Sequence, residues 1–131
     1  MMGAPPAVAP SARLQLHFKA TKLADMDTFS KSDPYLVVFR QDPQGPQGKS
    51  GGEVGRTEMI KDDLNPIWKK TVAVDYFFEA KQEFVVKLWD DDGNKRDDEN
   101  DALGEAHFSL GQVVGSRNHS KEFKLHPKGT L

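Results

Sequence analysis

Short runs of alternating apolar and polar residues, or of β-branched residues, recur along this chain between turn-rich segments. In residues 13–20 (RLQLHFKA), Leu14, Leu16 and Phe18 share one face of an extended chain, and polar side chains occupy the other. Several short strands with one apolar face each are typical of a sandwich of two antiparallel sheets. We therefore predict an all-β fold.

Seven segments have this character. The predicted strands are residues 13–20, 35–39, 56–60, 68–76, 83–90, 102–110 and 120–127. Residues 42–55 are rich in glycine and proline, which predicts a long flexible connection between the second and third strands. Residues 110–116 (LGQVVGS) are expected to form a helical turn. The segment PKGTL at residues 127–131 stands where an eighth strand would begin, so we expect that strand to be truncated.

The composition excludes several kinds of site. The 131 residues suffice for one domain, which we place at residues 12–131, after a flexible segment at residues 1–11 that lacks a secretion signal. The absence of cysteine excludes a disulfide scaffold, a thiolate zinc site and a cysteine nucleophile. No apolar run reaches the roughly 18 residues that span a bilayer. A formal net charge of -2 offers no basic field for nucleic acid. These features favour a cytoplasmic protein whose membrane contact is peripheral.

Half of the acidic residues fall in two short segments. Of the 20 Asp and Glu residues, three lie in residues 25–33 and seven in residues 90–101, and each segment adjoins a predicted strand. Carboxylates held about 4 Å apart repel by roughly 4 kcal/mol per pair at a surface-like dielectric, so their convergence favours a bound cation. Calcium takes six to eight hard oxygen ligands in adaptable geometry. The alternative interpretation is a pair of solvated acidic loops without a metal.

The second acidic segment also matches part of another calcium-binding motif, the EF-hand loop. Positions 1, 3, 5, 9 and 12 of such a loop would be Asp90, Asp92, Asn94, Asp98 and Asp101. However, Lys95 stands where the tight turn requires glycine, and position 12 lacks the longer glutamate. Residues 83–89 before it also have a strand pattern, so we reject the EF-hand.

An enzyme is the main alternative from another functional class. A hydrolase requires a nucleophile with a base within hydrogen-bonding reach. The four histidines lie on predicted strands or near the end of the chain, without a GxSxG motif or a metal-binding spacing around them. We therefore expect no catalytic residues.

Four motifs occur in an order and spacing that resemble C2 domains. They are SDPY at residues 32–35, LNPIW at residues 64–68, DDD at residues 90–92 and DALG at residues 101–104. The resemblance covers residues 13–131, and the long third acidic loop followed by SLGQVV is most similar to the first C2 domain of copines. This resemblance implies an antiparallel eight-stranded Greek-key β-sandwich in the permuted, phospholipase-like (type II) topology. It also implies calcium-dependent binding to phospholipid.

The resemblance assigns calcium ligands as well. C2 domains bind calcium through five acidic positions in two loops, and four of these positions fall on Asp27, Asp33, Asp90 and Asp92. The fifth is open between Asp98 and Asp101, because the third loop is three residues longer than is common. We favour Asp101, which directly precedes the next strand, with Asp98 as an additional ligand. The backbone carbonyl of Met26 is a further expected ligand.

The same loops are expected to contact an anionic phospholipid membrane. Calcium would change the loop cluster from anionic to cationic, which is an electrostatic switch. Phe29 in the first loop either enters the bilayer interface or packs beneath the loop. Lys95 and Arg96 either contact lipid phosphate or offset the neighbouring acids. We expect recruitment from the cytoplasm to the plasma membrane when calcium rises, and protein partners stay open.

Many C2 domains also carry a basic groove for phosphoinositides. The residues that match this groove are Arg56, Lys69, Lys70, Tyr35 and Trp68. Glu58 occupies one of the two usual lysine positions, so we expect a weak or absent phosphoinositide preference. The alternative interpretation of Lys69 and Lys70 is that of solvated strand residues.

Together these features predict a calcium-dependent phospholipid-binding module that is not an enzyme. The alternative is a C2-type module that binds proteins without calcium, since a fold does not fix a function. A calcium titration separates the two functions, because both predict the same sandwich.

Overall fold

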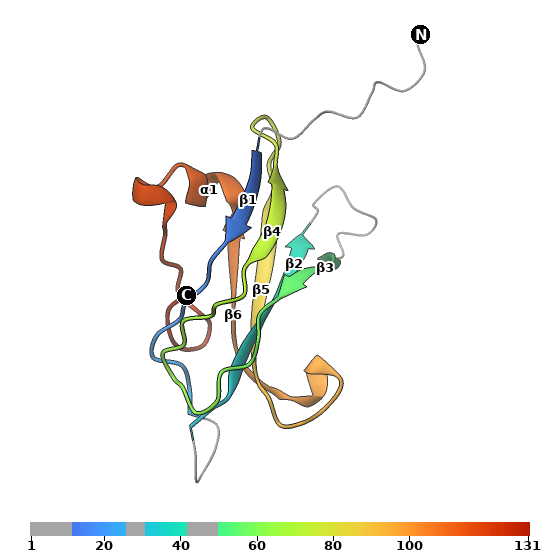
Figure 1. Cartoon of the computed structure of the whole chain (residues 1–131), viewed down its shortest axis with the longest axis vertical. Helices are drawn as coiled ribbons and strands as arrows, with labels where there is room; N and C mark the ends of the chain where they lie inside the picture. The colour runs from blue at the N-terminus through green and yellow to red at the C-terminus, as the bar shows by residue number, and fades with distance from the viewer. Residues whose placement is uncertain (1–11, 26–30, 42–49) are drawn as a thin grey trace.

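The computed structural model describes residues 12–25, 31–41 and 50–131, which form short strands and a few helical turns (Figure 1). The strands are β1 (Ala12–Leu16), β2 (Pro34–Gln41), β3 (Ser50–Arg56), β4 (Val72–Tyr76), β5 (Glu83–Asp90) and β6 (Asp101–Ser109). The helical elements of the described residues are α1 (Leu110–Val114) and the 3-10 turns η2 (Asp97–Glu99) and η3 (Arg117–His119). In the described part of the chain, no helix has the length and hydropathy needed to cross a bilayer. The predicted flexible segment at residues 1–11 lies outside the described residues.

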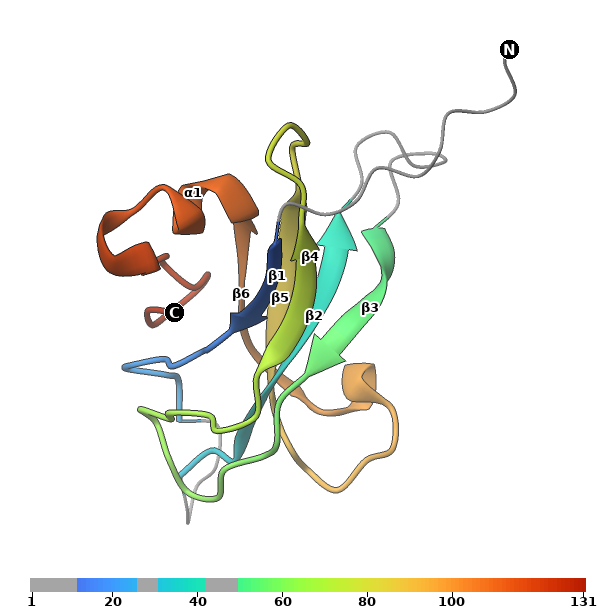
Figure 2. The same ribbon diagram turned by 45° about the horizontal axis from the view of Figure 1, so that its top comes forward.

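Two antiparallel sheets stack on one another, as Figures 1 and 2 show. β1 pairs with β4 in the smaller sheet, and the larger sheet has the order β3-β2-β5-β6. The chain passes from the larger sheet to the smaller one after β3 and returns after β4, so that β2 and β5 become neighbours. The predicted all-β antiparallel sandwich is confirmed.

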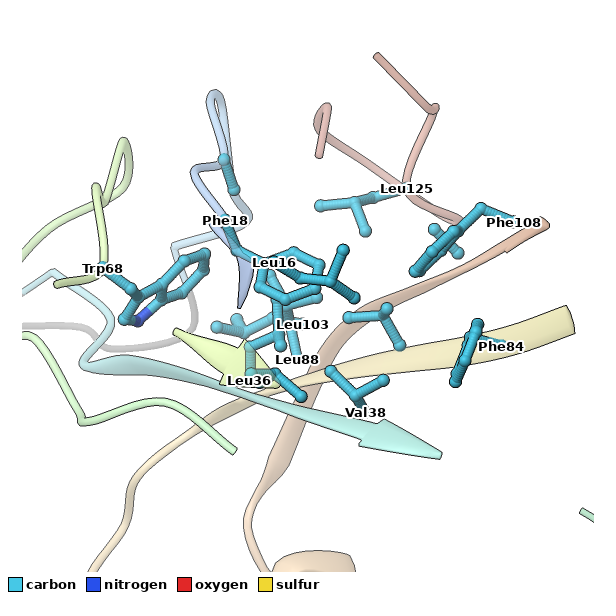
Figure 3. Close-up of a cluster of buried hydrophobic side chains, with 14 of the residues drawn as sticks. Leu16, Phe18, Leu36, Val38, Trp68, Phe84, Leu88, Leu103, Phe108 and Leu125 are labelled. Atoms are coloured by element: carbon cyan, nitrogen blue, oxygen red, sulfur yellow. The ribbon is translucent and has the colours of Figure 1, made fainter. Parts of the chain in front are cut away.

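The hydrophobic core lies between the two sheets (Figure 3). Leu36, Val38 and Leu88 point into it from the larger sheet, and Leu16 and Phe18 point into it from the side of β1. The alternating pattern of residues 13–20 had placed Leu16 and Phe18 on the apolar face of their strand. Full burial of such a side chain stabilises the fold by about 1.5–3 kcal/mol, so this one cluster holds both sheets together.

The third strand begins earlier than the sequence pattern indicated. The predicted connection was wrong for residues 50–55 and the predicted strand at residues 56–60 was misplaced, because residues 50–56 form β3. The rest of the predicted connection, residues 42–49, lies outside the described residues. β3 contains three glycines and is held to β2 by backbone pairing. A Cβ atom at Gly55 would lie 2.9 Å from Cγ1 of Val72 on β4. Glycine there permits the close approach of the two sheets and does not mark a loop.

The predicted seventh strand at residues 120–127 was also wrong. Lys124 bridges Thr130 and His126 bridges Glu105 of β6, but these are isolated bridges and not a continuous ladder. Thr130 in turn exchanges backbone hydrogen bonds of 2.8 and 3.0 Å with Thr21. The residues around Thr130 therefore lie between the segments around Thr21 and Lys124. They belong to residues 127–131, the stretch in which an eighth strand was expected to begin.

α1 confirms the helical turn predicted at residues 110–116. Ser109 caps it: the Gln112 backbone N–H donates to the Ser109 hydroxyl, and the Ser109 N–H donates to the Gln112 side chain. This reciprocal capping satisfies two backbone donors at the start of the helix. Leu110 is fully buried and anchors the turn to the core.

Candidate metal-binding site

Three strands of the larger sheet have their ends close together at one end of the sheet, the lower end in Figure 1. β2 begins there, β5 ends there and β6 begins there. The register pairs Pro34 with Asp90 and Asp90 with Asp101. Asp33, which precedes β2, therefore adjoins the second acidic segment. The end of the first acidic segment, at Asp33, is thus a neighbour of the second segment in space, as the metal hypothesis requires.

A β-bulge decides which residue of β6 faces Asp90. The register between β5 and β6 shifts by one residue after Leu88, and Leu103 is the extra residue. A regular ladder pairs residues one to one, so the pairing of Leu88 with Gly104 would have placed Ala102 opposite Asp90. Alternate side chains point to opposite faces, so this shift by one residue changes which side chains share a face. With the bulge, Leu103 enters the core and Asp101 faces Asp90.

Asp90, Asp92 and Asp101 form a group of carboxylates suited to a cation. One oxygen from each lies within 4.8 Å of the others. Asp90 is fully buried, whereas Asp92 and Asp101 are exposed. Calcium–oxygen bonds of about 2.3–2.6 Å place two ligands of one ion no more than roughly 5 Å apart. The spacing of these oxygens therefore fits calcium.

Asp33 is tied to this group through its backbone. Its N–H donates to Oδ1 of Asp90 at 2.8 Å, and its carbonyl accepts from the N–H of Asp91 at 3.0 Å. Its carboxylate accepts from the N–H of Asp62 at 2.8 Å, in the connection between β3 and β4. The structure thus brings Asp33 beside Asp90, and the Asp33 side chain points towards the connection between β3 and β4.

Asn100 holds the connection between β5 and β6, residues 91–100, in a closed form. We refer to this segment, which corresponds to the third loop of C2 domains, as the third acidic connection. Its Oδ1 accepts from the backbone N–H of Asp92 at 3.0 Å, and Asp92 Oδ2 accepts from the N–H of Asp101 at 3.0 Å. The Asn100 side chain also donates to the Tyr35 hydroxyl at 2.9 Å. Asn100 is buried, so its bond to Tyr35 is shielded from water, whereas the bond from Asp101 to Asp92 is exposed.

Asp97 ties the same connection to the outer face of the larger sheet. Its carboxylate accepts from the Tyr35 hydroxyl at 2.7 Å and from the Arg56 guanidinium at 3.0 Å. Burial acts to raise the pKa of Asp97, but the hydrogen bonds from Tyr35 and Arg56 outweigh it and hold this pKa below its ordinary value. Burial and the bond to Asp97 raise the pKa of Tyr35. Tyr35 is therefore a neutral donor at all physiological pH values.

Asp98 lies apart from the group of three carboxylates. It pairs with Arg96 at 2.9 Å, and both side chains are largely exposed. Lys95 is exposed beside them. Met26, Asp27 and Phe29 fall outside the described residues, so their predicted roles stay predictions.

The residues matched to a phosphoinositide groove do not share one exposed surface. Trp68 is buried in the core, where its indole N–H donates to the carbonyl of Pro34 (Figure 3). Tyr35 is buried beneath the third acidic connection, and Arg56 is engaged by Glu53 and Asp97.

Lys69 and Lys70 are exposed, and their backbone N–H groups donate to the carboxylate of Glu58. Of the five matched residues, these two lysines are the exposed cations, whereas Arg56 is partly exposed and paired with Glu53 and Asp97. Phosphoinositide binding stays a prediction.

Sequence reasoning missed the roles of Asn100 and Asp97. Both stand in a polar stretch without hydrophobic periodicity, and their partner Tyr35 is more than 60 residues away in the sequence. The available signal was chemical: asparagine both donates and accepts, which suits a buried link between two loops.

A sequence model of the C2 domain family matches residues 13–125. The chain belongs to the C2 domain family. This C2 domain is 38% identical to Copine-E of Dictyostelium discoideum over 104 residues, which are 78% of the chain and 17% of Copine-E. It is 37% identical to Copine-B of the same organism over 121 residues, which are 89% of the chain and 22% of Copine-B. The resemblance to copines is confirmed, and the chain spans about a fifth of the length of these relatives.

Solved structures support the same family. The two tandem C2 domains of extended-synaptotagmin 2 are 27% identical, with a TM-score of 0.69, and the match covers 100% of this chain and 42% of that one. The calcium-bound form of the same protein gives 27% identity and a TM-score of 0.65, over 94% of this chain and 44% of that one. C2 domains of this kind form a family of membrane- and calcium-binding modules.

Proposed function

We propose that this C2 domain binds calcium at the end of the larger sheet where β2 begins, β5 ends and β6 begins. We propose that the calcium-bound form binds anionic phospholipid membranes. The observation that carries the proposal is the convergence of three carboxylates, one of them fully buried, within 4.8 Å. The proposed ligands are Asp27, Asp33, Asp90, Asp92 and Asp101, with Asp98 and the backbone carbonyl of Met26 as further donors.

The donor set favours calcium over other divalent ions. It consists of carboxylate and carbonyl oxygens, whereas zinc prefers nitrogen and sulfur ligands. Magnesium requires near-ideal octahedral geometry and keeps several waters, which a site assembled from separate strand ends does not readily supply. The calcium-bound state of extended-synaptotagmin 2, a structural neighbour at 27% identity, adds support.

The exposed side of the site is suited to a membrane surface. Bound calcium supplies positive charge and open coordination positions for lipid phosphate. Asp92 and Asp101 are exposed, so the outer part of the site is accessible to a lipid head group. Lys95 and Arg96 are exposed in the same connection and add positive charge, which Asp98 partly offsets at Arg96. Phe29 is the proposed apolar contact with the bilayer.

In the cell we propose that this C2 domain recruits a longer, copine-like protein from the cytoplasm to the plasma membrane when calcium rises. The similarity to copines over 78% and 89% of the chain supports this role. We propose that the C2 domain acts by binding and not as an enzyme, and that proteins at the membrane are further partners.

Calorimetric titration with calcium tests the metal site, and sedimentation with vesicles tests the membrane function. We expect calcium to bind and magnesium to bind far more weakly. We also expect calcium to promote binding to vesicles that contain phosphatidylserine but not to vesicles of phosphatidylcholine alone. A folded protein that shows neither response would overturn the proposal and favour the calcium-independent protein-binding module.

A further inference from the structure

The third acidic connection is fastened to the larger sheet by side chains outside the proposed ligand set. Tyr35 on β2 and Arg56 on β3 lie on the sheet, and Asp97 and Asn100 lie on the connection. We refer to these four residues as the Tyr35 cluster. Its members come from three separate parts of the sequence, so the cluster forms only in the folded protein.

Asn100 joins the cluster to two proposed ligands. It accepts the backbone N–H of Asp92, and its own side-chain N–H donates to Tyr35. Asp101 follows it in the chain and donates its N–H to the carboxylate of Asp92 at 3.0 Å. The backbones of Asp92 and Asp101 and the carboxylate of Asp92 are therefore positioned through Asn100.

Tyr35 is the fixed end of this chain of hydrogen bonds. It is buried on β2, and its hydroxyl donates to Asp97 at 2.7 Å while it accepts from Asn100. Arg56 donates to both oxygens of Asp97, at 3.3 and 3.0 Å, which balances the charge of that carboxylate. Asp97 is thus occupied by the sheet and is not a free ligand.

We propose that Tyr35 and Asn100 are positioning residues of the calcium site, which hold Asp92 and Asp101 in place before an ion arrives. This inference rests on the proposed function. Neither residue belongs to the proposed ligand set; both act through the backbone of residues 91–101. Hydrogen bonds from Asp92 to Asn100 and from Asp101 to Asp92 join the two ends of the connection, and the bond from Asn100 to Tyr35 joins it to the sheet.

The size of the effect follows from loop ordering. Each loop residue that must be fixed on binding weakens an affinity by about five- to thirtyfold. Partners that orient metal ligands typically change metal affinity by about 10- to 100-fold when removed. We therefore expect Tyr35→Phe, which removes one hydroxyl and no charge, to weaken calcium binding about tenfold.

The test compares Tyr35→Phe and Asn100→Ala with Tyr76→Phe, a matched loss of a hydroxyl on β4 in the other sheet. Calorimetry gives the calcium dissociation constant of each variant, made in the whole chain. Hydrogen exchange of the amides of residues 92 and 101, measured in chelator, reports whether the connection stays closed without an ion. This second readout does not depend on calcium binding.

The expected result is an about tenfold weaker calcium affinity for Tyr35→Phe, an equal or larger loss for Asn100→Ala, and less than a twofold change for Tyr76→Phe. Exchange at residues 92 and 101 should accelerate in the first two variants alone. Unchanged affinity and exchange in Tyr35→Phe would overturn the inference while the proposed function stands. If the wild-type protein takes up no calcium, the proposed function is overturned. Faster exchange in Tyr35→Phe would then still support the positioning of the two backbones, and unchanged exchange would refute it.

Discussion

Replacing Asp90 by asparagine should stabilise the calcium-free protein and abolish its stabilisation by calcium. Asp90 is fully buried, and its carboxylate lies within 4.8 Å of oxygens from Asp92 and Asp101. Asparagine has the same shape and can still accept the 2.8 Å hydrogen bond from the backbone N–H of Asp33. The substitution therefore removes a buried charge and leaves the packing unchanged.

The magnitude follows from the spacing of the carboxylates. Two charges 4.8 Å apart repel by about 3.5 kcal/mol at an effective dielectric of about 20. Asp92 and Asp101 are exposed to solvent, and exposed charge pairs usually measure only about 0.2–1 kcal/mol. We therefore expect the two relieved repulsions together to add about 0.5–2 kcal/mol to the free energy of unfolding. For a domain of this size that is a rise in Tm of about 2–8 °C.

The assay is thermal unfolding of both proteins in chelator and at saturating calcium. At about a hundred times its dissociation constant, calcium should add roughly 2.7 kcal/mol to the wild-type protein and little to Asp90→Asn. The order of stability should therefore reverse between the two conditions. Glu99→Gln is the matched control, because it removes one negative charge in the same connection at an exposed residue outside the proposed ligand set. Destabilisation of Asp90→Asn in chelator, or an unaltered calcium response, would show that Asp90 is a structural residue and refute the reasoning.

Three further predictions concern other parts of the molecule. Asp101→Ala should weaken calcium binding in calorimetry by more than Asp98→Ala, because only Asp101 belongs to the group of three carboxylates; the reverse order would place the last ligand at Asp98. Gly55→Ala should lower the free energy of unfolding in urea by about 1–3 kcal/mol, since its Cβ would lie 2.9 Å from a valine of β4. Gly52→Ala, with nothing within 4 Å, should change it little. The pKa of Asp97 in the folded protein is below the ordinary value of 3.8, so the stability it contributes is present above that value and is lost as the pH falls through the lower, folded-state value. The difference in Tm between the wild-type protein and Asp97→Asn should thus shrink in an acid series below about pH 4, and a constant difference would contradict this.

Much of the fold was predictable because strand periodicity is a local property. The alternation around Leu16 and Phe18, and around Leu88, gives the core faces directly, since a period of two is set by the backbone. β3 was not predictable in the same way. Its glycines have low strand propensity, and backbone pairing with β2 outweighs that preference only in the folded protein.

The candidate site was predictable in its residue types but not in its geometry. Acidic segments beside strands indicate a cation because carboxylates repel, whatever the fold. The meeting of Asp90 with Asp101 depends on the β5–β6 register, which the sequence pattern does not encode. The Tyr35–Asn100 link depends on the β2–β5–β6 arrangement and on a polar stretch with no periodic signal. The sequence therefore indicated the three clustered carboxylates as candidate ligands, but it did not indicate the residues that support them.

The bulge at Leu103 has a consequence for how chains of this family can change in length. It places the extra residue between the core part of β6 and Asp101, so the sheet absorbs one residue there without moving Asp101 away from Asp90. Insertions on the other side of Asp101 enter residues 91–100 and leave the ladder untouched. A change in length before Asp101 therefore does not affect the pairing after it, and a change in length after Asp101 does not affect the loop before it. Two C2 domains with third loops of different lengths can therefore keep this carboxylate in the same place, and counting residues from Asp90 does not find it.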